Sequence, residues 1–541
     1  MERLALIGSE LPPKVTDAVS RVNGARVATA SAFTAILRFG SADHYDVFCL
    51  QEQVGPLERY AEALADQGIA IERVQLVPPP RVRETLATSR YLAVHDPTSP
   101  HLARLAAMVR PLASEATPCT CVSYSLSYAN LLPHFLEACT AGLHPTDAVF
   151  CCSTDSRTAL QRLLEHLCAV TGLAPESWRH RLELAPLGVD VEAYAPALPI
   201  PAARQRLGLP SEGRYLTYVG RLSPFDKADL DVLLRVFATL AREPGGDDLR
   251  LVLAGDDSQR YSGYLHARSQ SLGIAHAIRI ITDISEATKR LLLWSTDVFV
   301  SPADSVQESF GLAVVEAMAA RRPVVVSDWG GYRDLVEDGR SGFLIPTVWG
   351  PCTSAVDTQT ELGSFMADHL LLGQAVALDE DTLTDRLREL LANPGLRAAM
   401  GERAREYARR YDWPVIVKQY EHIWHDLKHA ALKAGRGPRP AVRFPFWQVF
   451  GHYPTHRLQP SDVVELRRHA LSRPPAPAPL QLLVPEQVIS RLLALLTEGP
   501  RPVSALVQGE QDMLGLLWLA KAGSVRIRAA VSAEQRPDSA S

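Results

Sequence analysis

The segment 297–344 constrains the fold of this chain more than any other, because it alternates short apolar runs with one strong helix. Residues 297–302 (DVFVSP) are apolar and end at a proline, as a buried strand does, and 323–327 (PVVVS) repeats the pattern. Between them, 312–320 is rich in strong helix formers. Strand, helix and strand in this order predict a β-α-β unit with parallel strands and a right-handed crossover.

The start of this helix is the candidate ligand site. Gly311 precedes it, so an anion can come close to the free N–H groups of the first turn, and phosphate is their natural occupant. Glu308 lies just before the helix and Glu316 follows eight residues later. Two carboxylates repel a phosphate, but they accept hydrogen bonds from the hydroxyls of a sugar and a ribose. On pattern alone the simpler interpretation is favoured, a loop glutamate and a solvated helical one.

The surrounding sequence changes that balance. ESFGLAVVEAMA resembles the E-x7-E signature of family 4 retaining glycosyltransferases, and the resemblance continues through PVVVSDWGG, VEDG and SGFL. Several matching segments in the same order are far more specific than a lone glycine motif. The resemblance extends over about residues 1–432 and implies an α/β protein of the GT-B fold. In that fold, two doubly wound Rossmann-like domains face a cleft.

Composition limits the classes of function. The chain has 541 residues, 47% of them hydrophobic and 22% charged, which is typical of soluble globular proteins with several domains. A net charge of -5 gives no electrostatic reason to expect nucleic acid or an anionic membrane as the main partner. The eight cysteines lack zinc-ribbon spacing and predict buried free thiols in a reducing compartment. Without a signal-like or membrane-length apolar run, we expect a cytoplasmic protein, compatible with peripheral attachment at the inner membrane face.

Alternating strands and helices in 1–190 predict the first Rossmann-like domain, on the acceptor side of the cleft. Where relatives carry a glycine-rich loop, only Gly24 is present. His95 ends a predicted strand, where such folds place ligands, although a turn cap explains it equally well. Tyr124 stands where related enzymes commonly carry a His near the transferred sugar. Since Tyr is a poor base at neutral pH, a role that needs an imidazole here stays open.

Residues 191–410 predict the second Rossmann-like domain, which binds the nucleotide sugar. Its first strand leads into GRLSPFDK, where Arg221 and Lys227 can converge on a diphosphate and stabilise the departing nucleotide. The resemblance identifies this pair with the family's phosphate-binding residues. It places Thr282 and Ile284 at the nucleotide base, which relatives hold mostly through the backbone. The implied donor site comprises Arg221, Lys227, Thr282, Ile284, Glu308, Phe310, Gly311, Leu312 and Glu316.

Two D-x-D triplets, 229–231 and 379–381, match the metal motif of the other glycosyltransferase fold. Each stands at or just before the start of a predicted helix, where carboxylates interact favourably with the helix dipole. We therefore expect neither a metal ion nor a cofactor.

The remaining segments are less regular. Residues 347–373 predict an insertion near the cleft, and 411–432 a helix that crosses back to the first domain. Beyond it we expect a linker region (433–479), a small, mainly helical accessory domain (480–530) and a disordered tail (531–541).

The accessory domain has an outline like a winged helix, in residues 497–528. Its candidate reading helix, MLGLLWLAKA, offers only Lys521 for strong hydrogen bonding to a base edge. This composition favours contact with a protein partner and argues against nucleic acid.

The implied reaction moves a sugar from a nucleotide diphosphate donor to an acceptor with retention of configuration and without a metal. Arg221 and Lys227 would hold the diphosphate, Glu308 the sugar near the reacting carbon, and Glu316 the ribose. The acceptor, a sugar, lipid, peptide or small molecule, would lie on the first-domain side. One alternative is a nucleotide-sugar 2-epimerase, which needs acid/base groups in the first domain. The other is a non-catalytic GT-B partner subunit, against which the full Arg/Lys/Glu set argues.

Overall fold

The computed structural model describes residues 2–8, 24–98, 100–195, 198–351, 356, 367–438, 446–450, 452–467 and 475–530. The chain divides into two compact units. The first comprises Met1–Pro78 and Glu84–Val442, and the second Pro79–Arg83 and Arg443–Ser541. Among the described residues, no helix combines the length and the apolar character that crossing a membrane requires.

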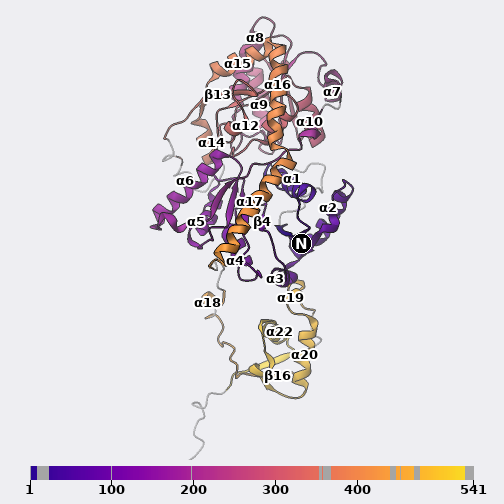
Figure 1. The fold of residues 1–541 in the computed structure, drawn as a ribbon, viewed down its shortest axis with the longest axis vertical. Helices are drawn as coiled ribbons and strands as arrows, with labels where there is room; N and C mark the ends of the chain where they lie inside the picture. The colour runs from indigo at the N-terminus through magenta and orange to yellow at the C-terminus, as the bar shows by residue number, and fades with distance from the viewer. Residues whose placement is uncertain are drawn as a thin grey trace, which may run out of the picture. The chain divides into compact units, whose positions relative to one another are not determined.

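The first unit contains two parallel sheets, which lie in its lower and upper halves in Figure 1. The sheet of the first domain has seven strands in the order β3-β2-β1-β4-β5-β6-β7. Since the order reverses between β1 and β4, right-handed crossovers place helices on both faces, and the strands are buried accordingly. The strands are β1 (Arg3–Ile7), β2 (His44–Phe48), β3 (Val74–Val77), β4 (Val94–Asp96), β5 (Cys119–Ser123), β6 (Ala148–Cys151) and β7 (Arg181–Leu184). The helices are α1 (Gly24–Phe39), α2 (Val54–Ala65), α3 (Pro79–Thr88), α4 (Leu102–Val109), α5 (Leu132–Thr140) and α6 (Thr154–Thr171).

The second domain repeats this plan with six strands in the order β10-β9-β8-β11-β12-β13. The order reverses between β8 and β11, so ligands are expected at the carboxyl ends of these two strands. The strands are β8 (Arg214–Val219), β9 (Leu249–Gly255), β10 (Ile278–Thr282), β11 (Val298–Ser301), β12 (Val324–Ser327) and β13 (Gly342–Ile345). The helices are α7 (Ile200–Arg206), α8 (Asp231–Arg242), α9 (Tyr261–Ser271), α10 (Glu286–Ser295), α11 (Leu312–Ala319), α12 (Tyr332–Leu335), α14 (Ala367–Gln374), α15 (Glu380–Ala392) and α16 (Pro394–Ala408).

The segment with which the sequence analysis began folds as expected. β11 and β12 pair in parallel, with Phe299 opposite Val324, and α11 connects them. The segment predicted as an insertion starts with β14 (Thr347–Val348), which pairs antiparallel with β15 (Ala377–Leu378). Residues 352–355 and 357–366 of it lie outside the described part of the chain, and α14 forms its end.

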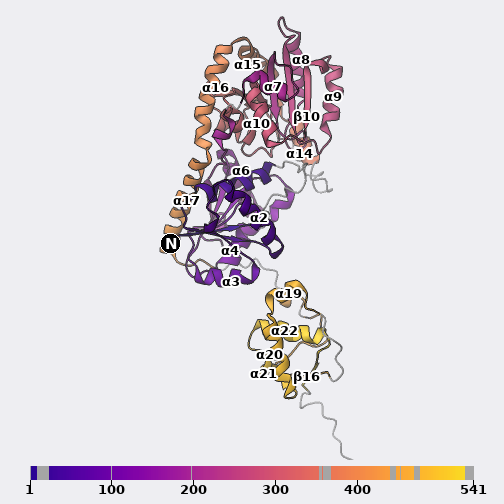
Figure 2. The ribbon, with the colours of Figure 1, turned by 90° about the vertical axis from the view of Figure 1, so that its right-hand side faces the viewer.

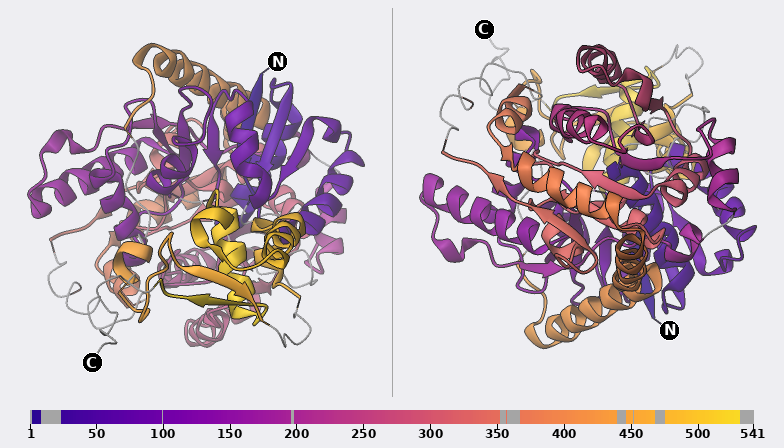
Figure 3. Two further views of the ribbon diagram at one scale, coloured as in Figure 1. Left: turned by 90° about the horizontal axis from the view of Figure 1, so that it is seen from below. Right: turned by 90° about the horizontal axis from the view of Figure 1, so that it is seen from above.

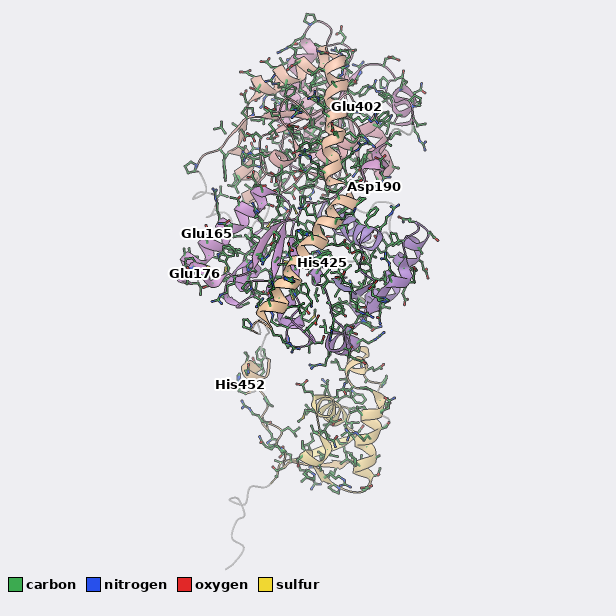
Figure 4. All side chains as sticks on the ribbon, in the orientation of Figure 1. Glu165, Glu176, Asp190, Glu402, His425 and His452 are labelled. Atoms are coloured by element: carbon green, nitrogen blue, oxygen red, sulfur yellow. The ribbon has the colours of Figure 1, made fainter. Side chains whose placement is uncertain are left out.

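The chain passes between the two domains twice, at adjacent points. The backbone N–H of Val189 donates to the carbonyl of Tyr411 (2.8 Å), and that of Trp413 donates back to Val189 (3.2 Å). Asp190, labelled in Figure 4 at this junction, accepts a hydrogen bond from the N–H of Ala193 (3.2 Å). The first two bonds join the two segments that connect the domains, around Val189 and 411–413, and we call this pair of segments the hinge.

Helix α17 (Trp413–Ala434) leads from this hinge back along the first domain. In Figure 2, α16 and α17 follow one another along one side of both domains, and in Figure 3 α17 lies near the N-terminus. Its buried Tyr420 and Trp424 pack against Phe150 of β6, with ring centroids 5.1 and 5.9 Å away. The predicted crossing helix is thus present and braces the first domain.

The second unit has its own apolar core. Its antiparallel sheet, in the order β17-β16-β18, packs with helices around Val464, Leu492, Leu516 and Leu519, which are fully buried. The elements are α18 (Phe446–Phe450), β16 (Val463–Leu466), α19 (Ala478–Leu483), α20 (Glu486–Thr497), β17 (Arg501–Pro502), α21 (Val503–Leu506), α22 (Glu510–Lys521) and β18 (Val525–Arg528). β16 lies within 433–479, which was expected to be a linker region. It belongs to the second unit because Val464 on this strand is part of the apolar core. The tail 531–541 lies outside the described residues.

Candidate active site

The loops after β8 and β9 meet at the switch point of the second sheet. Gly220 directly follows β8, and Gly255 is the last residue of β9, at φ +155°. A Cβ atom at Gly255 would lie only 1.7 Å from the carbonyl oxygen of Gly220. Only glycine permits this approach, which brings the loop that carries Arg221 and Lys227 to the edge of the site.

The N-terminus of α11 is the second wall of the site. Gly311 caps the helix at φ +112°, and a Cβ there would lie 2.5 Å from the Tyr332 ring. A Cβ at Gly330 would meet the Glu308 carbonyl at 2.5 Å. The turn after β12 therefore presses directly on the loop before α11. The buried Phe310 ring packs edge-on against Tyr411, 5.7 Å away, and anchors that loop from behind.

Glu308 and Lys227, two of the predicted site residues, are 81 positions apart in the chain and form an ion pair. The Glu308 side chain is 7% exposed and that of Lys227 21%. The hydroxyl of buried Tyr332 also donates to Glu308 (3.2 Å), and lies 2.8 Å from Ser301 Oγ at the end of β11. Glu308 is therefore held on two sides while part of Lys227 still faces solvent.

Arg221 forms an ion pair with Asp226 on the same loop. Asp226 also accepts hydrogen bonds from Ser223 Oγ (2.8 Å) and from the Tyr128 hydroxyl of the first domain (3.3 Å). Burial opposes the charge on Arg221, but Asp226 and Tyr128 hold its pKa above the ordinary value. The guanidinium thus stays charged beside the cleft.

Glu316 lies on the second turn of α11, and its side chain is 9% exposed. It accepts from Lys289 of α10 (2.7 Å), which also pairs with Glu286 (3.0 Å). Burial lowers the pKa of Lys289, but the two carboxylates outweigh this and raise it. Burial and the charge of Glu316 likewise raise the pKa of Tyr194. Sequence reasoning missed Lys289, because nothing in its own segment marks it.

The residues expected near the nucleotide base lie at the carboxyl end of β10, the outermost strand of the sheet. Thr282 is exposed and Ile284 half-buried. Between them, the N–H of Asp283 donates to the Gly255 carbonyl (3.0 Å) with Asp283 at φ +54°. Leu312 is the first residue of α11.

Two of the expected first-domain residues do not present side chains to the cleft. His95 is fully buried, with Nδ1 2.9 Å from Thr120 Oγ1 and its ring 5.2 Å from that of Trp424. Burial lowers the pKa of His95 to about 3, so the ring is neutral, and it belongs to the core beneath α17. The Tyr124 hydroxyl donates to the Pro97 carbonyl (2.9 Å), and the side chain is buried. Gly24 begins α1.

The loop after β5 nevertheless reaches the donor side. The carbonyl of Tyr124 accepts from Ser309 Oγ (2.6 Å). Gln307 bonds to two serines of this loop, Ser125 (2.5 Å) and Ser127 (2.6 Å). The polar run SYSLSY at the end of a buried strand is the sequence feature from which this contact could have been predicted.

The D-x-D carboxylates make protein contacts typical of helix starts. Asp231 pairs with Arg268 (2.6 Å) and with Arg235, and Asp379 caps α15 by accepting from the Thr382 N–H (2.9 Å). Within the described ranges, no group of three or more His, Cys, Asp or Glu side chains is arranged to hold a metal ion. Metal independence stays a prediction.

Comparison with known proteins identifies similar sequences and structures. Residues 199–349 match the family model "Glycosyl transferases group 1", and this span contains Arg221, Lys227, Glu308 and Glu316. The D-inositol 3-phosphate glycosyltransferase of Kineococcus radiotolerans is 31% identical over 267 residues, 48% of this chain and 55% of that protein. The phosphatidyl-myo-inositol mannosyltransferase of Mycobacterium leprae is 29% identical over 248 residues, 46% of this chain and 54% of that protein. The chain thus spans about half the length of the curated relatives it matches.

Solved structures show the fold. Anabaena HepE in complex with UDP aligns with a TM-score of 0.53 at 20% identity, over 78% of this chain and 99% of that one. Sucrose-phosphate synthase from Thermosynechococcus elongatus aligns with a TM-score of 0.52 at 18% identity, over 80% and 100%. The two Rossmann-like sheets and the crossing helix therefore form a GT-B glycosyltransferase fold. Within it, residues 199–349, which match the glycosyl transferases group 1 model, lie in the second domain.

Proposed function

We propose that this chain is a glycosyltransferase that moves a sugar from a nucleotide diphosphate donor to an acceptor hydroxyl, with retention of configuration and without a metal ion. One observation carries the proposal: three cations each pair with a carboxylate, Lys227 with Glu308 just before α11, Lys289 with Glu316 on α11, and Arg221 with Asp226 on the loop after β8. The group 1 match over 199–349 includes all three.

The ion pairs suggest how a donor binds. A diphosphate would replace Asp226 at Arg221 and Glu308 at Lys227, and the first N–H groups of α11 would complete its binding site. This exchange frees the Glu308 carboxylate to accept hydrogen bonds from donor sugar hydroxyls. The cations that pair with carboxylates in the free protein would then pair with the donor.

The same groups would lower the barrier to transfer. As the bond between the sugar and the phosphate breaks, negative charge grows on the departing diphosphate beside two cations that are already in place. Such preorganised charge is usually the largest single contribution to catalysis. Because Arg221 and Lys227 supply the positive charge, a divalent ion is not required by this scheme.

Glu316 would bind the ribose hydroxyls, with Lys289 fixing the orientation of its carboxylate. The backbone around Thr282 and Ile284 would hold the base. The acceptor would bind on the first-domain side, where the loop after β5 meets Gln307. The names of two relatives contain inositol phosphate and phosphatidyl-myo-inositol. These names support including both kinds of compound in the panel of acceptors to be tested.

A thermal-shift screen of nucleoside diphosphates and nucleotide sugars tests the donor part. A ligand at 100 times its Kd stabilises the native state by about 2.7 kcal/mol, so a true donor raises Tm clearly. The shift should disappear in Lys227→Ala. Absence of any shift with the wild-type chain, or an equal shift in the variant, contradicts the proposal.

Product analysis tests the rest. The best donor is incubated with an acceptor panel, and NMR determines the anomeric configuration of the product. Activity should survive exhaustive EDTA treatment. A loss that Mn²⁺ or Mg²⁺ restores would refute metal independence, and an inverted anomer would refute retention.

One observation favours the epimerase alternative. His101 Nε2 and His134 Nε2 lie 3.0 Å apart, following β4 and β5 in the first domain, where acid/base groups would be needed. Incubating each UDP-sugar without acceptor decides between the two, because only an epimerase produces the 2-epimer of the donor.

A further inference from the structure

Helix α14 places an imidazole against the first-domain loop that follows β5. His369 Nδ1 lies 2.9 Å from Asp368 Oδ1, and its Nε2 lies 2.8 Å from Ser127 Oγ. The His369 ring also packs on Tyr128, with centroids 5.1 Å apart. The His369 side chain is 1% exposed, so it is enclosed between the two domains.

The loop that His369 contacts bonds in turn to both donor loops. The Ser127 hydroxyl donates to Gln307 Oε1 (2.6 Å), next to Glu308 in the chain. The Tyr128 hydroxyl donates to Asp226 (3.3 Å), the partner of Arg221. His369 therefore lies directly behind a loop that touches the neighbours of two proposed donor residues.

The hydrogen bonds also define what His369 does chemically. A hydroxyl has one proton, and Ser127 gives it to Gln307, so Ser127 Oγ accepts from His369 Nε2–H. Asp368 Oδ1 lies 2.9 Å from Nδ1 and fixes the plane of the ring. A side chain with an N–H donor at the same reach, such as Gln, can replace this function in part.

We propose that His369 is a positioning residue for transfer. It holds the loop 124–128 against the two donor loops through Gln307 and Asp226, so that the loops that carry Glu308 and Arg221 stay in place when the donor binds. This inference rests on the proposed function, and it gives α14 a role in supporting the first-domain loop that meets the donor loops.

Amide hydrogen exchange of the full chain without ligand tests the contact itself. Peptides that cover 124–131 should exchange roughly tenfold faster in His369→Ala, because the loop loses its support. His369→Gln should restore most of the protection. Leu371→Ala is the matched control, since Leu371 lies on the same helix with 42% of its surface exposed, and it should leave the loop unchanged. Unchanged exchange in His369→Ala would overturn the proposal.

Kinetics test the positioning role. Donor turnover, measured as transfer or as hydrolysis to water, should fall about 10²-fold in kcat for His369→Ala, the scale expected for slight misplacement of reacting groups. The donor KM and the Kd of the nucleoside diphosphate should change by less than about threefold, because Arg221 and Lys227 remain. His369→Gln should recover much of kcat. A large rise in donor KM at unchanged kcat would instead assign His369 to ground-state binding and contradict the proposal.

Two further controls keep the result decisive. If His369→Ala lowers Tm strongly, Ser127→Ala removes the same hydrogen bond from the other side and should reproduce the kcat loss. If the wild-type chain binds no nucleoside diphosphate, the proposed function fails and the role in transfer fails with it. The exchange experiment still decides separately whether His369 holds the loop.

Discussion

At the scale of single residues, the candidate site consists of ion pairs, in which a bound donor would replace one of the two partners. Lys227 with Glu308 and Lys289 with Glu316 are each largely buried, and removing charges from water is costly unless partners are in place. Each carboxylate therefore orients its cation in the free protein. A diphosphate with a sugar offers the same groups new partners, so binding need not expose an unpaired charge.

The first prediction concerns the two cations of the β8 loop. Arg221→Ala and Lys227→Ala should each leave the fold intact and lower kcat by about 10²–10³-fold, the usual cost of removing one group that stabilises developing charge. Steady-state kinetics with the best donor measure this. Arg340→Ala, which removes an exposed cation of the same domain, is the control and should retain full activity. Near wild-type turnover in Lys227→Ala would rule out the assigned role.

The second prediction separates the two glutamates. The proposed function assigns Glu316 to the ribose, so Glu316→Ala should mainly raise the donor KM. It assigns Glu308 to the sugar beside the reacting carbon, so Glu308→Ala should mainly lower kcat. Donor saturation curves for both variants distinguish these effects, and finding them interchanged would reverse the assignment.

The third prediction is a pH dependence of stability that arises from Asp304. Burial, and to a lesser extent the charge of Asp229, raises the pKa of Asp304 to about 7 from 3.8. An unfolded Asp loses its proton near pH 4 while the folded one keeps it to about pH 7, so this residue's contribution to stability falls across that range. At about 1.4 kcal/mol for each pKa unit, the loss is at most roughly 4 kcal/mol.

Asp304→Asn tests this, because the amide keeps the size of the side chain but cannot ionise. The Tm of the variant relative to wild type should rise from about pH 5 to about pH 8. A Tm difference that is constant over this range would contradict the assignment.

How far the site could be predicted depends on what each residue contacts. Arg221, Lys227, Glu308 and Glu316 were predicted because the motifs that carry them resemble those of a known family in sequence and order. Their contacts Asp226, Lys289 and Tyr332 were not singled out, since pairing across separate segments leaves no local pattern.

His95 shows the opposite case. It lies near the carboxyl end of β4, as a ligand-binding residue would, yet α17 covers it and its ring lies 5.2 Å from that of Trp424. Position at a strand end is a local property of the sequence. Burial by a helix more than 300 positions away is not.

At the scale of elements, the hinge between the domains depends on one close contact. A Cβ atom at Gly188 would lie 2.4 Å from the Trp413 ring, which starts α17. This contact joins the last segment of the first domain to the crossing helix. The two alternating domains could be predicted from the sequence, but this contact could not, because it joins segments 225 positions apart.

The fourth prediction follows from this contact. Gly188→Ala should destabilise the chain by about 1–3 kcal/mol, the usual cost of overpacking. Gly263→Ala is the matched control: Gly263 lies inside α9 with nothing within 4 Å of an added Cβ. That variant should be stabilised by up to about 1 kcal/mol through helix propensity. Calorimetric unfolding of both decides, and equal Tm values for the two variants would contradict the role of the hinge contact.

At the scale of the whole molecule, the chain joins a GT-B unit to a second unit with its own core. The region from 435 onwards has 13 Lys and Arg residues and 8 Asp and Glu residues, a formal net charge of +5. Its elements α20, β17, α21, α22 and β18 follow the order of a winged helix, with β16 as the central strand. The net positive charge and the order of elements are both compatible with DNA binding. The side chains of the helix that would read the bases are not.

α22 is that helix, and along its middle it exposes Leu514 and Leu517, at 37% and 44% exposure, while the polar Gln511 and Lys521 are exposed only at its two ends. Reading a base edge needs Arg, Asn, Gln or similar groups, and leucines provide only apolar contact. We therefore expect the second unit to contact a protein partner and to leave donor chemistry unaffected. Removing residues 443–541 should keep nucleoside diphosphate affinity within about twofold, because Arg221 and Lys227 lie in the first unit.

The fifth prediction compares the full chain with that truncated chain in anisotropy titrations with duplex DNA at physiological salt. The cut falls after Pro438, whose carbonyl accepts from Arg110 (3.1 Å), so the first unit keeps this contact with the end of its chain. Both proteins should bind no tighter than the non-specific range of about 10⁻⁴–10⁻⁶ M. Tight, sequence-selective binding by the full chain that is lost on truncation would contradict the prediction. It would make the basic surface of the second unit, rather than its exposed leucines, the interacting feature.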